Sequence, residues 1–382
     1  MKKNTIKKTK SYFLFSPENG TREAQVLLHA ESGLTIKESW NSVVKQLKDL
    51  EGELGFGKDS KCFMRVFLSD AQNQEHILRR EFPEYFDMSK RVCLSIVQQA
   101  PMPNSKLAMW IYLVEGENKV IITKFGRIFK SNGLQHIWTA NLTGDQDLNT
   151  FGQTEGMFNK YIQLLKEFNS NMLNNAIRTW IYVRDVDATY SGVVEARKQI
   201  FEEEGLTEDS HFIASTGIEG RNEYQSCLSF MDTYSVVGIK PQQLQYLTVP
   251  DYMCSTSEYG VTFERGTSII YGDRRHVFIS GTASINLHGD VLFPEEVELQ
   301  TVRIVENIEA LLNSTSCELE DVAMGLVYIR DIADYEKVKK IVDKLFPSTP
   351  MICLMASVCR PSWLVEIEVI AIKKEKNEFS KF

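Results

Sequence analysis

The chain has 382 residues, of which 43% are hydrophobic and 25% charged, and its formal net charge is −8. This is the composition of an ordinary globular protein with a sizeable core, and the acidic balance argues against nucleic-acid binding, which depends on many Lys and Arg contacts to phosphate. No stretch approaches the ~20 apolar residues of a membrane span, and the apolar run at 11–15 is too short for a secretory signal, so we expect a cytoplasmic protein without membrane or nucleic-acid partners.

Three consecutive segments, 11–115, 116–240 and 241–382, predict three copies of one structural unit. In the first segment, a helix with one apolar face is followed by strands at 63–68, 92–97 and 107–113. The helix face is formed by residues three and four positions apart, which are Trp40, Val43, Leu47 and Leu50.

The second segment repeats this order of elements. Residues 137–140 predict a strand, and a helix follows whose apolar face contains Thr154, Phe158, Tyr161 and Leu165. A buried strand at 181–183, a helix at 196–203 and two further strands complete the unit.

The third segment is the clearest copy. A hairpin is predicted at 269–279, with a turn whose Arg274 and Arg275 we expect to face solvent. The remaining elements are a helix from about residue 294, a strand at 326–329, a helix at 334–345, and strands at 351–358 and 364–372.

Shared motifs support the repeat. IYVRD at 181–185 recurs as VYIRD at 327–331, and MRVFLSD at 64–70 is a fainter copy at the same place. Arg184 and Arg330 close equivalent strands, and we expect both to form structural ion pairs. The most economical fold is α+β, with a mixed sheet and two helices on one face in each unit, and three units in one pseudo-trimeric chain.

Cysteine and histidine patterns indicate neither a disulfide framework nor a metal site. The seven cysteines are scattered, odd in number and without a C-x-x-C pair, which fits free thiols in a reducing compartment. The six histidines show no H-x-x-x-H spacing. We expect no metal and no organic cofactor.

The third copy resembles the YjgF/Rid superfamily, whose members are also described as endoribonuclease L-PSP-like. The resemblance rests on FISGTASI at 278–285, on the helix with QT at 300–301 and ENI at 306–308, and on RD at 330–331. The ending, with VCRP at 358–361 and LVEIE at 364–368, is similar to the chorismatase branch of single-chain relatives that hydrolyse chorismate. The resemblance implies tandem Rid-like (chorismate mutase-like) units with ligand clefts between them.

Rid deaminases carry an Arg and a Cys two residues apart and a Glu fifteen residues after the Arg. The third copy has Met351, Cys353 and Glu366 at these positions. Met cannot replace the guanidinium fork that holds a substrate carboxylate, which argues against imine deamination. The residues assigned to these positions in the other copies are Arg91, Cys93 and Lys106 in the first, and His211 and Ile213 in the second.

Glu366 is the predicted catalytic residue. Alternation along the last strand puts Glu366 and Glu368 on one face of an otherwise apolar segment. If Glu366 faces a cleft, desolvation raises the pKa of its carboxyl and leaves a proton to donate near neutral pH. In chorismatases the Glu that matches Glu366 protonates the methylene of an enol ether, and the resemblance implies the same role here.

Substrate-binding residues are expected around this acid. Arg360, in the turn before the strand, would bind a carboxylate, and Cys359 would border the pocket as in the chorismatases that make hydroxybenzoate. The segment GTAS at 281–284 offers either ligand contacts or only a tight turn. The other candidates for substrate binding are Arg265, Arg91, Thr282 and Ser284.

The leading hypothesis is a chorismatase-like lyase or hydrolase that acts on chorismate or a related enol-ether carboxylic acid and releases pyruvate. The alternatives are a Rid-type enamine/imine deaminase and a non-catalytic protein that binds small molecules. The expected partner is a small-molecule carboxylate. The sequence leaves open whether the chain is a monomer, a homodimer or a trimer.

Overall fold

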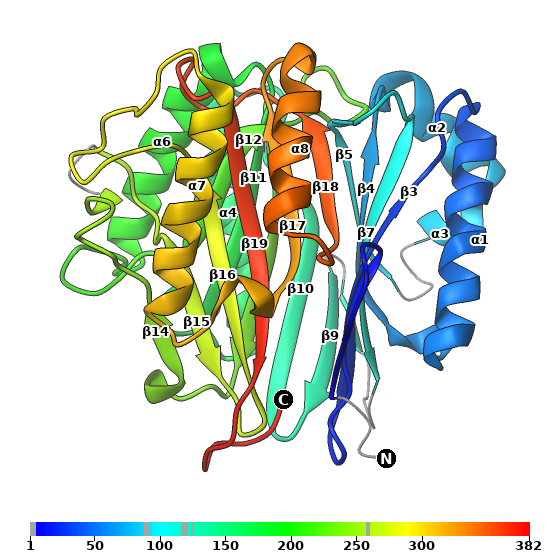
Figure 1. The fold of residues 1–382 in the computed structure, drawn as a ribbon. Helices are drawn as coiled ribbons and strands as arrows, with labels where there is room; N and C mark the ends of the chain where they lie inside the picture. Colours follow the sequence, from blue (N-terminus) through cyan, green and yellow to red (C-terminus); the bar gives the residue numbers. More distant parts are fainter. Residues whose placement is uncertain (1–4, 88–91, 116–120, 124–125, 257–259) are drawn as a thin grey trace.

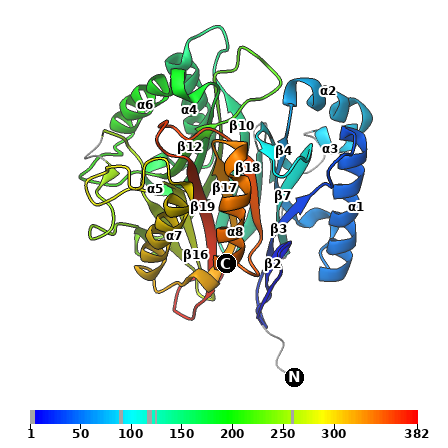
Figure 2. The same cartoon turned by 45° about the horizontal axis from the view of Figure 1, so that its top comes forward.

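Three mixed sheets meet along their inner faces, and the long helices lie on the outside (Figure 1). The computed structural model describes residues 5–87, 92–115, 121–123, 126–256 and 260–382. Figure 2 shows α1 and α2, α4 and α6, and α7 and α8 as three groups around the central sheets. This is the α+β, pseudo-trimeric arrangement predicted from the repeat. None of the described helices is long and apolar enough to cross a membrane.

The first sheet has the strand order β1-β2-β3-β7-β4-β5, in which only β4 and β5 run parallel. Trp40, Val43 and Leu47 of α1 are buried against this sheet, as the helical periodicity predicts. The elements are β1 (Ile6–Lys8), β2 (Tyr12–Phe15), β3 (Arg22–His29), α1 (Ile36–Leu54), β4 (Lys61–Leu68), α2 (Ala71–Glu81), α3 (Pro83–Phe86), β5 (Cys93–Gln98) and β7 (Leu107–Glu115).

The second sheet has the order β12-β11-β13-β10-β9-β8, and again one pair, β11 and β12, is parallel. The helix expected at 196–203 begins ten residues earlier, because its first turns (187–192, DATYSG) carry almost no apolar residues that a periodicity could register. The elements are β8 (Ile121–Ile122), β9 (Gly126–Ser131), β10 (Leu134–Thr143), α4 (Thr150–Glu167), α5 (Met172–Asn175), β11 (Ala176–Val183), α6 (Val186–Glu203), β12 (Ala214–Glu219) and β13 (Ser229–Val237).

The third sheet has the order β14-β15-β16-β19-β17-β18-β6. Its edge strand β6 (Ala100–Pro101) comes from the first segment and pairs with β18, which ties the start of the chain to its end. The other elements are β14 (Leu244–Tyr246), β15 (Gly266–Ile270), β16 (Arg274–Thr282), α7 (Val297–Asn313), β17 (Val322–Ile329), α8 (Tyr335–Leu345), β18 (Met351–Met355) and β19 (Val365–Lys374). Short 3-10 turns lie at Lys58–Ser60, Pro241–Gln243, Leu319–Asp321 and Ile332–Asp334.

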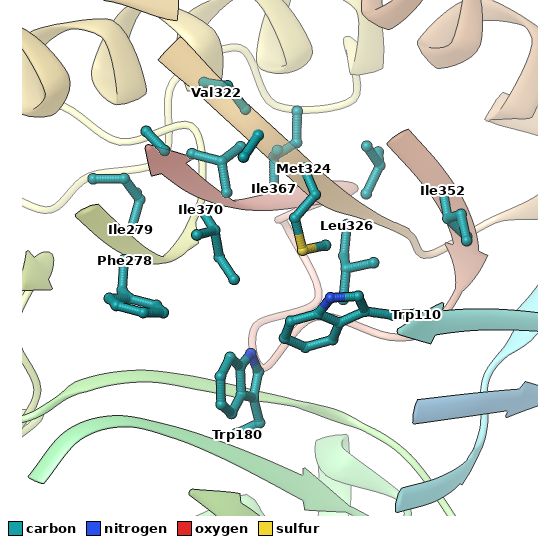
Figure 3. Packing of buried hydrophobic residues seen from close by; sticks show 14 of the residues in the cluster. Trp110, Trp180, Phe278, Ile279, Val322, Met324, Leu326, Ile352, Ile367 and Ile370 are labelled. Carbon is teal, nitrogen blue, oxygen red and sulfur yellow. The ribbon is translucent and has the colours of Figure 1, made fainter. Parts of the chain in front are cut away.

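The three sheets share one apolar centre. Trp110 of β7 and Trp180 of β11 point toward Met324 and Leu326 of β17 (Figure 3). The middle strands β4, β11 and β17 begin at residues 61, 176 and 322 and are eight residues long each, so equivalent positions are 115 and 146 residues apart. We propose 11–115, 116–240 and 241–382 as the boundaries of the three units.

A buried ion pair joins each pair of units. Arg65 bonds Asp232 at 2.8 Å, Arg178 bonds Glu368 at 2.8 Å, and Arg274 bonds Glu23 at 2.5 Å. The expectation that Arg274 faces solvent is therefore wrong. Its carboxylate partner lies 251 residues away in the chain, so no local pattern could indicate it.

The other arginines that the sequence marked as structural or solvent-facing follow different patterns. Arg275 is also buried and bonds Glu375 at 2.9 Å, which corrects the expectation that it faces solvent. Arg330 forms the predicted ion pair, with Asp187. Arg184 instead donates to backbone carbonyl oxygens, those of Cys227 at 3.2 Å and Tyr224 at 2.9 Å.

Candidate active site

A cavity of about 330 Å³ lies where the second unit meets the third. One wall is formed by α6 and β12, and the opposite wall by β16, β19 and the turn between β18 and β19. The residues that line it include Tyr190, Arg197, Ser215, Gly217, Arg265, Gly281, Cys359, Arg360, Trp363 and Glu366.

Glu366 is a buried acid on one wall of this cavity. Only 5% of the residue is exposed, and no hydrogen bond or ion pair joins its carboxyl to another residue that the structure describes. Burial, with a smaller repulsion from Glu368, raises the pKa of the Glu366 carboxyl to about 8, although Arg178 opposes this shift. Glu366 is therefore mostly protonated at neutral pH, as a general acid must be.

Gly281 of β16 allows this carboxyl to approach the backbone. A Cβ added at Gly281 would lie 2.1 Å from Oε1 of Glu366 and 3.0 Å from Cγ2 of Thr216. Any side chain at this position would displace the acid.

Glu368 lies on the same face of β19 and is held in place by the second unit. Its carboxylate accepts hydrogen bonds from Nη2 of Arg178 at 2.8 Å, from Nε1 of Trp180 at 2.8 Å, and from the Thr216 hydroxyl. The alternation predicted for 364–370 is confirmed, and the two carboxyl groups have different surroundings. Glu368 is bonded across the interface, whereas Glu366 faces the cavity.

Arginine side chains from both units line the cavity. Arg360 has its guanidinium over the Trp363 ring at 5.0 Å, and Arg265 donates from Nη2 to the carbonyl of Cys254 at 3.2 Å. The sequence singled out both residues, and they lie in the same cavity as Glu366. Arg197 of α6 also lines it. No sequence pattern indicates this, because an arginine within a helix normally faces solvent.

Cys359 lines the cavity beside the acid. Burial, followed by the nearby Glu366 carboxyl, raises the pKa of the thiol to about 12. The charges of Arg360 and Arg197 and a hydrogen bond with Tyr190 oppose this shift only in part. The thiol is therefore protonated at neutral pH and is a poor nucleophile.

Thr282 and Ser284 do not line the cavity. The hydroxyls of Thr282 and Ser284 donate to the backbone carbonyls of Ser280 and Leu292 at 2.9 and 3.0 Å. Their positions alternate with Gly281, Ala283 and Ile285, which do line it, so we remove Thr282 and Ser284 from the site. Arg91 lies outside the described residues.

Strand pairing corrects the alignment of the deaminase positions. Trp180 of β11 pairs with Thr216, and its counterpart Leu326 of β17 pairs with Ile352, so Thr216 and Ile352 are equivalent. The equivalents of Met351 and Cys353 are thus Ser215 and Gly217 in the second unit. In the first unit the counterpart of Trp180 is Arg65, which pairs with Ser95. The equivalents of Met351 and Cys353 there are therefore Leu94 and Ile96. The assignments of His211 and Ile213, and of Arg91 and Cys93, are wrong by four and three residues.

The cavity does not bring a deaminase set together. The residues of β12 that line it with Glu366 are Ser215, Thr216 and Gly217, whereas Cys353 belongs to β18 and does not line it. A Cβ added at Gly217 would lie 2.7 Å from the Tyr190 hydroxyl. Tyr190 thus occupies the space of a cysteine side chain at that position.

The acid is present in one unit of the three. In the third unit Tyr328 of β17 pairs with Glu366, whereas the equivalent pairs are Tyr182 with Phe230 and Phe67 with Ala108. Only the interface between the second and third units therefore has a carboxyl at this position.

Tandem α+β units around a common centre, with an acid at one interface, define a fused trimer of small α+β units. Residues 268–373 match the family model described as endoribonuclease L-PSP. A RutC family protein of Saccharolobus solfataricus is 32% identical over 99 residues, which cover 25% of this chain and 79% of that protein. The chain therefore belongs to the YjgF/Rid superfamily.

Solved structures show a similar fold. A chorismatase crystal structure at 1.08 Å resolution matches with a TM-score of 0.67 and 14% identity, over 93% of this chain and 100% of that one. A putative endoribonuclease from Thermotoga maritima is 20% identical over 34% of this chain and 98% of its own, with a TM-score of 0.29. The fold predicted from the repeat is thus that of a known single-chain protein over nearly its whole length.

Proposed function

We propose that this protein is a chorismatase-like hydrolase or lyase that cleaves chorismate or a related enol-ether carboxylic acid and releases pyruvate. The observation that carries the proposal is a buried carboxyl with a pKa of about 8 in a cavity lined by guanidinium groups. Hydrolysis of an enol ether that carries a carboxylate requires a proton donor for the enol ether and cationic groups that bind the carboxylate. The similarity in fold to a chorismatase supports the same function.

The chemistry begins with transfer of the Glu366 proton to the methylene carbon of the enol ether. The resulting oxocarbenium ion is attacked by water, and the water returns a proton to the Glu366 carboxylate. The hemiketal then collapses to pyruvate and the released ring alcohol, so that the net reaction consumes one water. A positioned general acid contributes roughly 10²–10⁴-fold to such a reaction.

In this proposal Arg360 and Arg265, which line the cavity, bind the substrate, a small-molecule carboxylate. Arginine forms paired hydrogen bonds with a carboxylate, and these are stronger in a partly dehydrated cavity. Holding the carboxylate fixes the methylene near the acid and lowers the entropic cost of the reaction. No metal or organic cofactor takes part in the steps that we propose.

The alternative of an imine deaminase has less support. The positions that carry Arg and Cys in that chemistry are Ser215 and Gly217 at this cavity. Ser215 cannot hold a carboxylate through a bidentate fork, and Gly217 has no thiol. A purely ligand-binding protein would have no need of a buried, protonated carboxyl without a hydrogen-bonded partner.

The test is incubation of purified protein with chorismate, with pyruvate followed by a coupled lactate dehydrogenase assay and the ring product identified by mass spectrometry. We expect pyruvate release by the wild type and its loss in Glu366→Gln. Absence of pyruvate with chorismate and with other enol-ether acids would refute the proposal.

A further inference from the structure

Arg197 differs from the other arginines in the interior of the protein. Among the residues that the structure describes, four arginines are buried to below 2% exposure, namely Arg65, Arg178, Arg197 and Arg274. Each of the other three bonds a carboxylate, as described above. No ion pair joins Arg197 to a described residue.

The hydrogen bonds of Arg197 are also incomplete. Nε donates to the Thr262 hydroxyl at 3.2 Å, and Nη2 is buried without a hydrogen-bond partner among the residues that the structure describes. A guanidinium keeps its charge in the interior, and a buried charge without a partner is strongly unfavourable. An anion bound at Arg197 would supply the missing partner.

The position of Arg197 indicates where that anion binds. Arg197 projects from α6 of the second unit and lines the same cavity as Glu366, whereas Arg360 lines it from the third unit. Among the described residues, the other carboxylate on the cavity wall is that of Glu195, an exposed residue. Guanidinium groups thus line the cavity from two opposite walls, Arg197 from the second unit and Arg360 from the third.

We propose that Arg197 binds a second carboxylate of the substrate, so that the site selects dianions with one carboxylate at Arg197 and the other on the Arg360 wall. This inference rests on the proposed function in placing the ligand in the cavity of Glu366. It adds that a monoacid with the same ring and ether leaves the Arg197 guanidinium unpaired and is therefore rejected.

Two stable compounds test the inference without turnover. The probe is 3-(carboxymethoxy)benzoate, and 3-methoxybenzoate has the same ring and ether oxygen but one carboxylate fewer. By isothermal titration at neutral pH we expect the wild type to bind the diacid about 10- to 100-fold more tightly than the monoacid, as for a hydrogen bond to a charged group. Equal affinity for the two compounds, or no binding of either, would overturn the proposal.

Variants then assign the preference to Arg197. We expect Arg197→Met to lose the preference for the diacid and Arg197→Lys to keep part of it. Thr262→Val, which removes the one hydrogen-bond partner of Arg197, should keep the preference. A buried arginine that has a carboxylate partner provides the control, because Arg275→Met should keep the preference although it loses the bond to Glu375.

Thermal unfolding without ligand separates ligand binding from a structural role. Arg197→Met removes an unpaired charge and should unfold at the same or a higher temperature than the wild type, whereas Arg275→Met should unfold at a lower one. A lower unfolding temperature for Arg197→Met, or a diacid preference that survives in it, would refute the proposal.

The outcome is distinguishable from failure of the proposed reaction. If the diacid binds through Arg197 but chorismate yields no pyruvate, the reaction is wrong and the anion site stands. If Arg197→Met releases pyruvate with an unchanged KM, the reaction stands and this inference fails.

Discussion

Replacing Glu366 by Gln should lower activity and raise stability at the same time. In the folded protein the pKa of this carboxyl rises from the usual 4.5 to about 8, mainly because of burial. Gln has nearly the same shape but cannot ionise or donate an acidic proton. We expect kcat for pyruvate release to fall by about 10²–10⁴-fold, the usual contribution of a general acid.

The gain in stability follows from proton linkage. Because the folded-state pKa lies above the unfolded one, the folded protein binds the proton more tightly, and its stability falls as the pH rises from 4.5 to about 8. At about 1.4 kcal/mol per pH unit, this loss is about 3 kcal/mol at pH 7 and about 5 kcal/mol above pH 8. Glu366→Gln avoids it, so its free energy of unfolding should exceed that of the wild type by about these amounts.

The assay is urea unfolding of both proteins between about pH 5 and pH 9, followed by circular dichroism, alongside the pH profile of kcat/KM. The two free energies should be similar near pH 5 and diverge as the pH rises, and kcat/KM of the wild type should fall above about pH 8. The control is Glu309→Gln on the exposed side of α7, which should change neither quantity. A difference in free energy of unfolding between the two proteins that does not change with pH would refute this account of the acid. So would a Glu366→Gln variant that keeps the wild-type activity.

Three further predictions follow from the geometry. Gly281→Ala places a Cβ against the Glu366 carboxyl, so kcat should fall by at least about tenfold as a displaced acid requires, and unchanged kinetics would contradict the packing. Cys359 should resist iodoacetamide at pH 8 in the folded protein, because its thiol pKa is raised to about 12; rapid alkylation on a peptide map would show otherwise. Arg178→Met leaves Glu368 buried without its ion-pair partner, so the free energy of unfolding should fall by about 3–5 kcal/mol in a denaturant titration. An effect no larger than that of Arg80→Gln, which changes an exposed arginine, would argue against a structural role for this pair.

The sequence predicts the architecture well because short motifs and residue periodicities reveal the repeat. IYVRD and VYIRD fall on β11 and β17, whose bounds differ by the same 146 residues as the motifs. Alternation in the last strand places Glu366 and Glu368 on one face. Both kinds of pattern concern neighbours in the chain, which is where sequence periodicity carries information.

Contacts between units are the part that the sequence could not predict. In the sequence, Arg274 has the pattern of a turn residue, but in the fold it is buried against Glu23 of the first unit. Arg197 has the pattern of a solvent-facing helix residue, but in the fold it lines the cavity between the second and third units. The alignment of β12 failed for a related reason. The loop before it differs in length from the loop before β18, and only hydrogen-bonded pairing, such as that of Trp180 with Thr216, fixes the register.

The presence of Ala108 and Phe230 at the positions equivalent to Glu366 has an evolutionary consequence. In a trimer of identical subunits, every substitution is made at all three interfaces at once, so an acid that serves one ligand must be tolerated three times. Covalent fusion removes this constraint. The equivalent positions at two interfaces are then free to become apolar and to stabilise the molecule. The third interface keeps a poorly solvated carboxyl, whose cost a symmetric trimer would bear at each of its three interfaces.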